Sequence, residues 1–306
     1  MNEIIMEKKL STYFSTYFFF FAISFFLVSC SPKLQGIVEE NNHIHAIAFD
    51  PTELEVMYVA THHYLEKIDL ESGDKERIGR YGDDFMGFVI ASDGTFYSSG
   101  HSPDVANVGI RKSTDKGKTW QTLAYEGYDF HDMAVSPADT PIIYAWSTPP
   151  REFLTVSGDG GNNWNEVETK GLKGSILSLG TDHQRKDVLY AGTLYGLFFS
   201  DNEGKNWQEI TALKNNPVIA IADDPVTEGI IYISTARQGV LKTKNSGKLW
   251  EELNQGSGGI QENLPISLTV NSHIPEEVYA ITKHSKIYIF QEGDENGNGW
   301  KEFSLK

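Results

Sequence analysis

Histidine and aspartate side chains gather in the first half of this chain in numbers that could bind a metal ion or transfer protons. Six of the nine histidines precede residue 132. Histidine is the commonest protein ligand for metal ions, and its imidazole titrates near neutral pH. Alternate residues of a strand point to the same side, so His43 and His45 would present both rings to one site. The other four are His62, His63, His101 and His131, and the aspartates among them include Asp83, Asp84 and Asp129.

A pattern that occurs four times, Ser-x-Asp-x-Gly-x-x-Trp, indicates the elements that must position these side chains. Its successive tryptophans lie 44, 43 and 43 residues apart, and a fixed period of this length predicts a stacked or circular array of one supersecondary unit. The Asp or Asn can accept backbone N–H bonds within its own turn, and the Gly supplies a positive φ. The four copies are Ser113, Asp115, Gly117 and Trp120; Ser157, Asp159, Gly161 and Trp164; Ser200, Asn202, Gly204 and Trp207; and Thr243, Asn245, Gly247 and Trp250.

Short apolar strands with a central tyrosine occur six times, although only four turn motifs are clear. Short β-rich segments with turns every ~8–12 residues exclude a helical solenoid. We therefore predict an all-β fold, a single β-propeller with six four-stranded blades. Seven blades would leave too few residues for each, and a further edge strand at Gln35–Glu39 leaves the closure of the ring open. The predicted blades span 43–81, 83–126, 129–169, 174–213, 217–254 and 264–305, and their tyrosines are Tyr58, Tyr97, Tyr144, Tyr190, Tyr232 and Tyr279.

The repeated turn resembles the Asp-box, or BNR repeat, of sialidases, sortilin-type receptors and photosystem II assembly factors related to Ycf48. Two copies keep the aspartate, whereas Asn202 and Asn245 replace it in the other two. Asparagine can make the same local hydrogen bonds, so the departure is mild. The resemblance covers most of the chain. It implies a propeller in which the motif residues fold the turn between the third and fourth strands of a blade and take no part in catalysis.

One face of such a propeller collects the start of the first strand and the end of the second strand of each blade, while the repeated turns lie on the opposite face. Loops on a rigid scaffold commonly form binding sites. We therefore predict a binding pocket on the first face. Its lining residues would be His43, His45, His62, His63, His101 and His131. The candidate ligands for zinc or another transition metal are His45, His62, His101 and His131. The candidate catalytic or orienting groups are Asp83, Asp84 and Asp129.

Two classes of function fit this pocket, and unrelated exposed loop histidines are the alternative to both. A binding or assembly module needs no catalytic group, and the sortilin-like and Ycf48-like resemblance supports it by analogy. A glycosyl hydrolase-like enzyme or a metal-dependent hydrolase would use the aspartates as a carboxylate pair or beside a metal ion. The resemblance to sialidases implies a grip of three arginines on the substrate, but only Arg237 falls at the predicted mouth. A sialidase is therefore disfavoured.

The amino terminus has the features of a bacterial lipoprotein signal. Residues 1–29 combine Lys8 and Lys9 with a long apolar run, which predicts a secretory signal peptide. The run ends in Leu27-Val28-Ser29-Cys30, and Cys30 is the only cysteine of the chain. We expect Cys30 to be lipidated and to anchor the chain to a membrane, with 30–42 as a tether and 43–306 as the propeller. An uncleaved membrane anchor is the alternative, and both interpretations place the domain outside the cytoplasm.

The charge of the chain limits its partners. The formal net charge is −16, which argues against nucleic acid and anionic lipid as ligands. Cations, glycans, peptides and other proteins remain compatible with such a surface. We expect a monomer that binds a protein or a glycan.

Overall fold

The computed structural model describes residues 43–137, 140–253, 260, 263–291 and 299–303. The predicted signal peptide (1–29), the tether (30–42) with Cys30, and the edge strand considered at Gln35–Glu39 lie outside these residues. No helix within the described ranges is long and apolar enough to cross a membrane.

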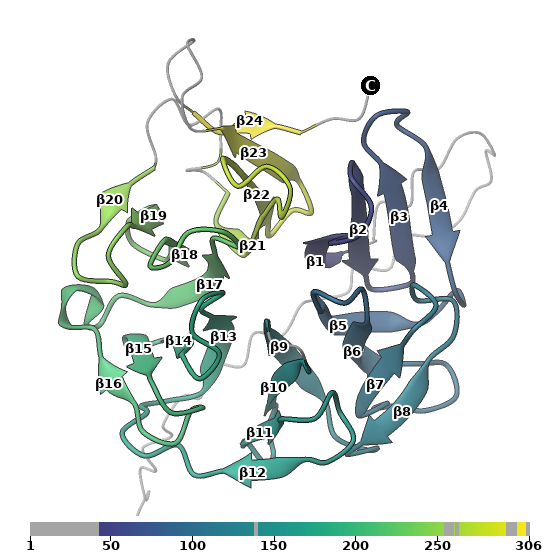
Figure 1. The fold of residues 1–306 in the computed structure, drawn as a ribbon, viewed down its shortest axis with the longest axis horizontal. Coiled ribbons are helices and arrows are strands. Elements are labelled where there is room, and N and C mark those ends of the chain that lie inside the picture. Colours follow the sequence, from purple (N-terminus) through teal and green to yellow (C-terminus); the bar gives the residue numbers. More distant parts are fainter. Residues whose placement is uncertain (1–42, 138–139, 254–259, 261–262, 292–298, 304–306) are drawn as a thin grey trace, which may run out of the picture. The chain divides into compact units, whose positions relative to one another are not determined.

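Six four-stranded antiparallel sheets stand in a ring around a central opening (Figure 1). This arrangement confirms the predicted six-bladed β-propeller, and every sheet falls within the residue range predicted for its blade. The first three sheets contain β1 (Ile44–Phe49), β2 (Val56–Thr61), β3 (Leu65–Asp69) and β4 (Lys75–Ile78); β5 (Asp84–Ile90), β6 (Phe96–His101), β7 (Ile110–Ser113) and β8 (Gln121–Ala124); and β9 (Phe130–Ser136), β10 (Ile142–Ser147), β11 (Leu154–Ser157) and β12 (Asn165–Val167).

The other three sheets follow the same order, from the inner strand to the outer strand. Each uses consecutive strands of the chain, so the described strands are not exchanged between blades. They contain β13 (Ile176–Thr181), β14 (Leu189–Thr193), β15 (Gly196–Ser200) and β16 (Gln208–Glu209); β17 (Val218–Asp223), β18 (Ile231–Thr235), β19 (Gly239–Thr243) and β20 (Glu251–Glu252); and β21 (Pro265–Val270), β22 (Glu277–Thr282), β23 (Ile287–Gln291) and β24 (Lys301–Glu302). A 3-10 turn, η1 (Thr211–Leu213), follows β16.

The tyrosine of each second strand lies in the core between neighbouring blades. All six are at most 3% exposed, and burying a ring of this size removes a large apolar area from water. The Tyr97 hydroxyl donates to the carbonyl of Gly160, and the Tyr144 hydroxyl donates to the carbonyl of Lys186. Each acceptor belongs to the next blade. All six tyrosines therefore fill the space between blades, and these two also join successive blades by hydrogen bonds.

The four repeated turns share one set of hydrogen bonds. In the first, Ser113 Oγ accepts the Gly117 N–H (2.8 Å), and Asp115 Oδ1 accepts the Thr119 N–H (2.9 Å). The other three copies repeat these two bonds. The indole N–H of Trp120 donates to the Gly117 carbonyl, as in the second and fourth copies. Trp207 differs, because its indole N–H has no hydrogen-bond partner in the described part of the chain. These bonds confirm the predicted turn chemistry, including its use of asparagine.

Side-chain packing closes the ring between the sixth and the first blade. Phe49 of β1 packs edge-on against Tyr279 of β22, with ring centroids 5.0 Å apart. His273 Nε2 lies 2.7 Å from the Asp50 carbonyl oxygen, and the Ser285 hydroxyl accepts the Ile44 N–H. The described part of the ring thus closes through a hydrophobic cluster flanked by hydrogen bonds.

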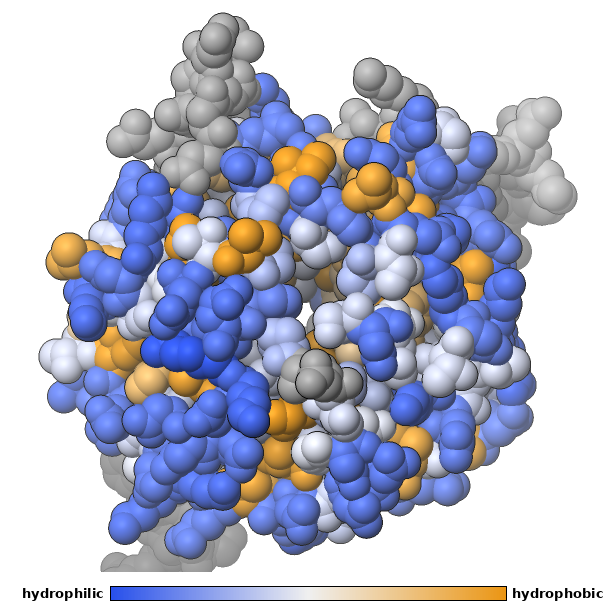
Figure 2. Space-filling view, viewed as in Figure 1, coloured by the Kyte–Doolittle hydropathy of each residue, from blue (hydrophilic) through white to orange (hydrophobic). Residues whose placement is uncertain are grey.

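The face in view is hydrophilic over most of its outer part, whereas the atoms around the central opening are mostly intermediate in hydropathy (Figure 2). The hydrophilic outer surface agrees with the acidic net charge of the chain, −16. On such a surface, a group of neighbouring exposed apolar side chains indicates a possible binding site, whereas single exposed apolar residues do not.

Candidate functional site

A β-bulge near the start of the first strand of every blade releases one side chain from the regular ladder. The pairing of the first and second strands skips one residue at the same place in all six sheets. Bulges commonly redirect a side chain next to a functional site. The six skipped residues, which we call the bulge ring, are His45, Met86, His131, Leu177, Ile219 and Ile266.

Asp84, the first residue of β5, lies against three histidines from two blades. Its Oδ1 is 3.3 Å from His45 Nε2, and its Oδ2 is 2.9 Å from His62 Nδ1 and 3.2 Å from His101 Nδ1. One ligand atom each from His45, His62 and Asp84 lie within 4.8 Å of one another. The backbone fixes this arrangement, because Asp84 and His101 are directly opposed in the β5–β6 ladder and the His62 N–H donates to the His43 carbonyl.

Asp129 extends the group to the third blade. Its Oδ2 lies 3.6 Å from His101 Nε2 and also contacts His131 Nε2. His101 therefore lies between two carboxylates, with one ring nitrogen toward each. The structure thus brings together six of the residues singled out from the sequence, which we call the histidine–aspartate cluster: His45, His62, Asp84, His101, Asp129 and His131.

The carboxylates of the cluster are largely buried, whereas most of its imidazoles are partly exposed to solvent. The side chain of Asp84 is 6% exposed, whereas that of His62 is 49% exposed. Burial alone would raise the pKa of Asp84, but the adjacent His45, His101 and His62 outweigh it and leave this pKa below its usual value. Burial lowers the pKa of His62, and Asp84 offsets this only in part. Near neutral pH the site therefore offers an ionised carboxylate beside a largely neutral imidazole.

Buried polar atoms without hydrogen bonds occur at the centre of the cluster. His45 Nε2 and Asp84 Oδ1 face each other, yet neither has a hydrogen-bond partner among the described residues, and the same holds for Asp129 Oδ1. Buried polar atoms in native proteins are nearly always bonded, and an exception calls for a physical reason. These atoms give the cluster unused capacity to bind a ligand.

Three residues grouped with this pocket from the sequence make their contacts beside the cluster. Asp83 forms a buried ion pair with Arg111 Nη1 (2.9 Å). His63 packs its ring against Tyr81, with centroids 5.7 Å apart, and against His62. His43 is exposed and contacts His62 through its backbone carbonyl. Asp83 is thus the partner of an arginine, while Asp84 and Asp129 face the histidines.

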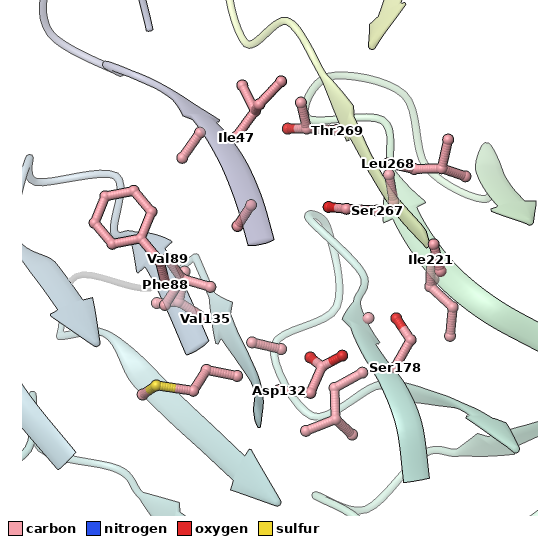
Figure 3. Close-up of a pocket in the computed structure, with 18 of the residues that line it drawn as sticks. Ile47, Phe88, Val89, Asp132, Val135, Ser178, Ile221, Ser267, Leu268 and Thr269 are labelled. Atoms are coloured by element: carbon pink, nitrogen blue, oxygen red, sulfur yellow. The ribbon is translucent and has the colours of Figure 1, made fainter. Parts of the chain in front are cut away.

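A central channel with a volume of about 400 Å³ begins at the bulge ring. His45 and His131 line one end, and its wall combines apolar residues such as Ile47 and Ile221 with polar ones (Figure 3). Among the polar residues, Asp132 lies near Ser178 in the close-up. Burial raises the pKa of Asp132 to about 8, although hydrogen bonds from the Leu179 N–H and the Ser178 hydroxyl oppose this. The carboxyl group of Asp132 is therefore largely protonated at neutral pH and adds little charge to the channel.

The bulge ring is chemically uneven. Blades 1 and 3 contribute histidines, whereas blades 4, 5 and 6 contribute Leu177, Ile219 and Ile266 at the equivalent position. Leu177 and Ile266 are each 38% exposed, and the turn after β14 adds Leu194 (64%) and Tyr195 (50%). One side of the mouth thus carries imidazole and carboxylate groups, while the other side exposes apolar side chains.

Another histidine–aspartate pair lies near the opposite mouth. His183 Nδ1 lies 3.3 Å from Asp223 Oδ2, and burial raises the pKa of Asp223 although His183 opposes this. Arg185 contacts both Asp182 of its own turn and Ser246 of a repeated turn in the next blade. The repeated turns therefore lie on the face away from the histidine–aspartate cluster.

Comparisons with known proteins identify the fold. No family model matches the sequence, and no curated protein sequence matches it. A solved ancestral GH74 enzyme gives a TM-score of 0.59 at 17% identity, over 84% of this chain and 38% of that chain. A GH74 xyloglucanase from Xanthomonas campestris gives 0.56 at 16% identity, over 84% and 46%. Ycf48 bound to D1 peptide gives 0.57 at 13% identity, over 86% and 82%. The chain spans less than half the length of the two GH74 enzymes, and these likenesses show a β-propeller fold.

Sequence reasoning did not find the bulge ring. The sequence placed His45 and His131 near the mouth, but it gave no reason to single out Met86, Leu177, Ile219 or Ile266. Alignment of the six repeats could have grouped these residues, because each occupies the same position in the first strand of its blade. The bulge that exposes them depends on strand pairing, which no single segment encodes.

Proposed function

We propose that this chain is an extracytoplasmic binding module of the bacterial envelope, anchored through a lipid on Cys30. In this account the propeller binds a protein or glycan ligand at the mouth that carries the histidine–aspartate cluster. The repeated turns act as Asp-boxes that fold the blades. The lipoprotein pattern at Leu27–Cys30 and the acidic composition support the location and the class of partner.

The uneven bulge ring is the observation that carries this proposal. Binding sites generally combine an apolar wall with a few convergent polar groups that orient the ligand. Here His45 and His131 occupy two of six equivalent positions, and Leu177, Ile219 and Ile266 occupy three others. If the six positions served only to fold the blades, there would be no reason for the two histidines to lie on the side of the histidine–aspartate cluster while blades 4, 5 and 6 carry only apolar residues there. A ligand with one polar group and one apolar surface would fit this division.

A glycosyl hydrolase-like enzyme is the second candidate. Asp84 and Asp129 flank the ring of His101, and the fold is shared with GH74 enzymes. However, the two carboxylates are 6% and 13% exposed, and histidine rings cover the groups that a sugar would have to reach. A catalytic pair needs its reacting atoms within hydrogen-bond reach of the substrate. The geometry therefore favours binding over glycoside hydrolysis.

Site-specific crosslinking in the envelope tests the proposal. We expect a photo-reactive residue at Leu177 to form an adduct with a discrete ligand, because this side chain lies in the bulge ring. The matched control is Val226, which is 61% exposed on the turn after β17 and should form none. Tyr195→Ala should weaken the Leu177 adduct, and Cys30→Ser should release the chain from the membrane fraction.

Two outcomes would contradict the binding account. Equal labelling from Leu177 and Val226 would mean that the cluster-bearing mouth is not the contact surface. Release of reducing sugar from xyloglucan by the purified chain, abolished by Asp84→Asn and Asp129→Asn, would favour the hydrolase instead.

A further inference from the structure

We propose that His45, His62 and Asp84 bind one divalent transition metal ion, of which Zn²⁺ is the representative. This inference rests on the proposed function, because it names the group that would meet the ligand at that mouth. The three residues come from β1, the turn after β2 and the start of β5. Two imidazoles and one carboxylate are a common protein ligand set for zinc that leaves a coordination position open.

The separations between the donor atoms fit such an ion. Ligands at roughly 2.1 Å from a tetrahedral Zn²⁺ lie about 3.4 Å from one another. His45 Nε2 and Asp84 Oδ1 are 3.3 Å apart, and His62 Nδ1 and Asp84 Oδ2 are 2.9 Å apart. All three ligand atoms lie within 4.8 Å of each other. A metal ion could therefore be accommodated with small side-chain rotations and no movement of the strands.

The unbonded buried atoms point to the same place. His45 Nε2 and Asp84 Oδ1 lack hydrogen bonds within the described structure although both are buried. The two atoms face each other at 3.3 Å without forming a hydrogen bond. Coordination to a common cation would satisfy both atoms at once.

The neighbouring residues have the arrangement that supports a metal ligand. His101 Nδ1 lies 3.2 Å from Asp84 Oδ2, and its Nε2 faces Asp129 at 3.6 Å. Outer groups that hold a ligating carboxylate in one orientation contribute substantially to metal affinity. His101 is thus a positioning residue that lies between Asp84 and Asp129, whereas His131 contacts Asp129 and lies outside the three-atom group.

The site remains accessible from solvent and from the channel. His62 is half-exposed, and His45 also lines the end of the channel. An open coordination position would therefore face a space where the polar group of a ligand can enter. The alternative is that the histidines serve only to compensate the charge of Asp84. In that case the chain would bind no stoichiometric metal ion.

Titration of the full chain with Zn²⁺ tests the proposal, in detergent, after purification without affinity metal and after a chelator has stripped bound metal and has itself been removed. We expect one equivalent to bind to the wild-type chain. Affinity should fall at least about 100-fold in His45→Ala and in Asp84→Asn, because each loses a direct ligand, and about 10-fold or more in His101→Ala. Co²⁺ bound in place of Zn²⁺ should give a visible absorption spectrum that His101→Ala shifts, which a purely structural role would not do.

His284→Ala is the matched control, because His284 is an exposed histidine in the turn after β22 and should leave Zn²⁺ affinity unchanged. If Asp84→Asn does not fold, His62→Ala provides the same readout, since its exposed side chain contributes little to the core. Absence of stoichiometric Zn²⁺ or Co²⁺ binding by the wild-type chain, or equal affinity in His45→Ala and His284→Ala, would overturn the metal site. Crosslinking from Leu177 that persists in that case would leave the binding function standing, whereas metal binding without such crosslinking would contradict the function alone.

Discussion

Asp84 is the residue on which the candidate site depends most. It contacts histidines from the first and second blades, and its carboxylate is almost completely buried. A buried carboxylate is tolerated only when hydrogen bonds or cations compensate for the loss of water. His101 hydrogen-bonds Oδ2, and the adjacent His45 and His62 also favour the ionised form of the carboxylate, while Oδ1 has no hydrogen-bond partner among the described residues.

The sequence could identify the residue types at this site but not their partners. Asp83 and Asp84 were equivalent candidates in the sequence, since both lie at the start of the second predicted blade, 83–126. Neighbouring residues of extended chain point to opposite sides, so one meets Arg111 and the other meets the histidines. Which of the two faces the mouth depends on the bulge two residues later, and the sequence does not reveal it.

The aspartates of the repeated turns should govern part of the acid stability. Hydrogen bonds from Thr119 lower the pKa of Asp115 to about 2, and those from Asn163 lower the pKa of Asp159 to about 2. A carboxyl with a pKa below its unfolded value stabilises the fold above pH ~4, and this contribution is lost as the pH falls through ~2. In the double variant Asp115→Asn/Asp159→Asn, the Tm should fall less steeply between pH 4 and pH 2.5 than in the wild-type chain.

Asparagine already occupies the equivalent position at Asn202 and Asn245 and makes the same backbone bond. The double variant should therefore fold at pH 7. Parallel Tm curves for the two proteins across the acid range would show that these carboxylates carry no linked stability.

The first strand of each blade, with its bulge, is the element that builds the mouth. In the second blade the bulge requires a close backbone approach at Gly100, which has a φ of +134°. A Cβ at this position would lie 2.3 Å from the Asp84 carbonyl oxygen and 2.9 Å from the Met86 nitrogen. The glycine thus allows β6 to pass against the bulge that presents Asp84.

Gly100→Ala should therefore disturb both stability and the site. We expect a loss of roughly 1–3 kcal/mol in the free energy of unfolding from the backbone strain, together with weaker Zn²⁺ binding, because the start of β5 must move. Chemical denaturation and metal titration measure the two effects. Gly127→Ala is the control, since Gly127 also has a positive φ (+92°) but no atom within 4 Å of its Cβ position. Unchanged metal affinity in Gly100→Ala would show that Asp84 does not depend on this contact.

At the level of elements, the sequence predicted most of what the structure shows. The tryptophan period and the central tyrosines located all six blades, because a repeated turn and a repeated buried ring leave a clear local pattern. The bulges left no such pattern. A bulge adds one residue to one strand of a pair, so its position can be recognised only when both strands are aligned.

The whole molecule is a closed ring whose ends meet through side chains. Successive blades pack through hydrophobic clusters, and the sixth and first blades use the same device with Phe49 and Tyr279. The candidate site spans blades 1–3, which include one side of this closure. The geometry of the candidate site therefore depends on the packing between the sixth and the first blade.

Truncation of Phe49 tests how strongly the ring is closed. We expect Phe49→Ala to cost about 3–5 kcal/mol in the free energy of unfolding, the usual loss for a buried phenylalanine. Phe198→Ala is the matched control, because Phe198 is buried in the cluster formed with the third blade. Denaturant unfolding should give similar losses for both variants. A nearly neutral Phe49→Ala beside a costly Phe198→Ala would mean that other contacts close the ring.

The central claim concerns one position on this ring, the space between His45, His62 and Asp84. Anomalous X-ray diffraction at the zinc absorption edge, from crystals of the chain grown with one equivalent of Zn²⁺, tests it most directly. The account predicts one strong anomalous peak about 2.1 Å from His45 Nε2, His62 Nδ1 and an Asp84 carboxylate oxygen. Anomalous peaks only at other positions, or none at all with these three side chains ordered, would contradict it.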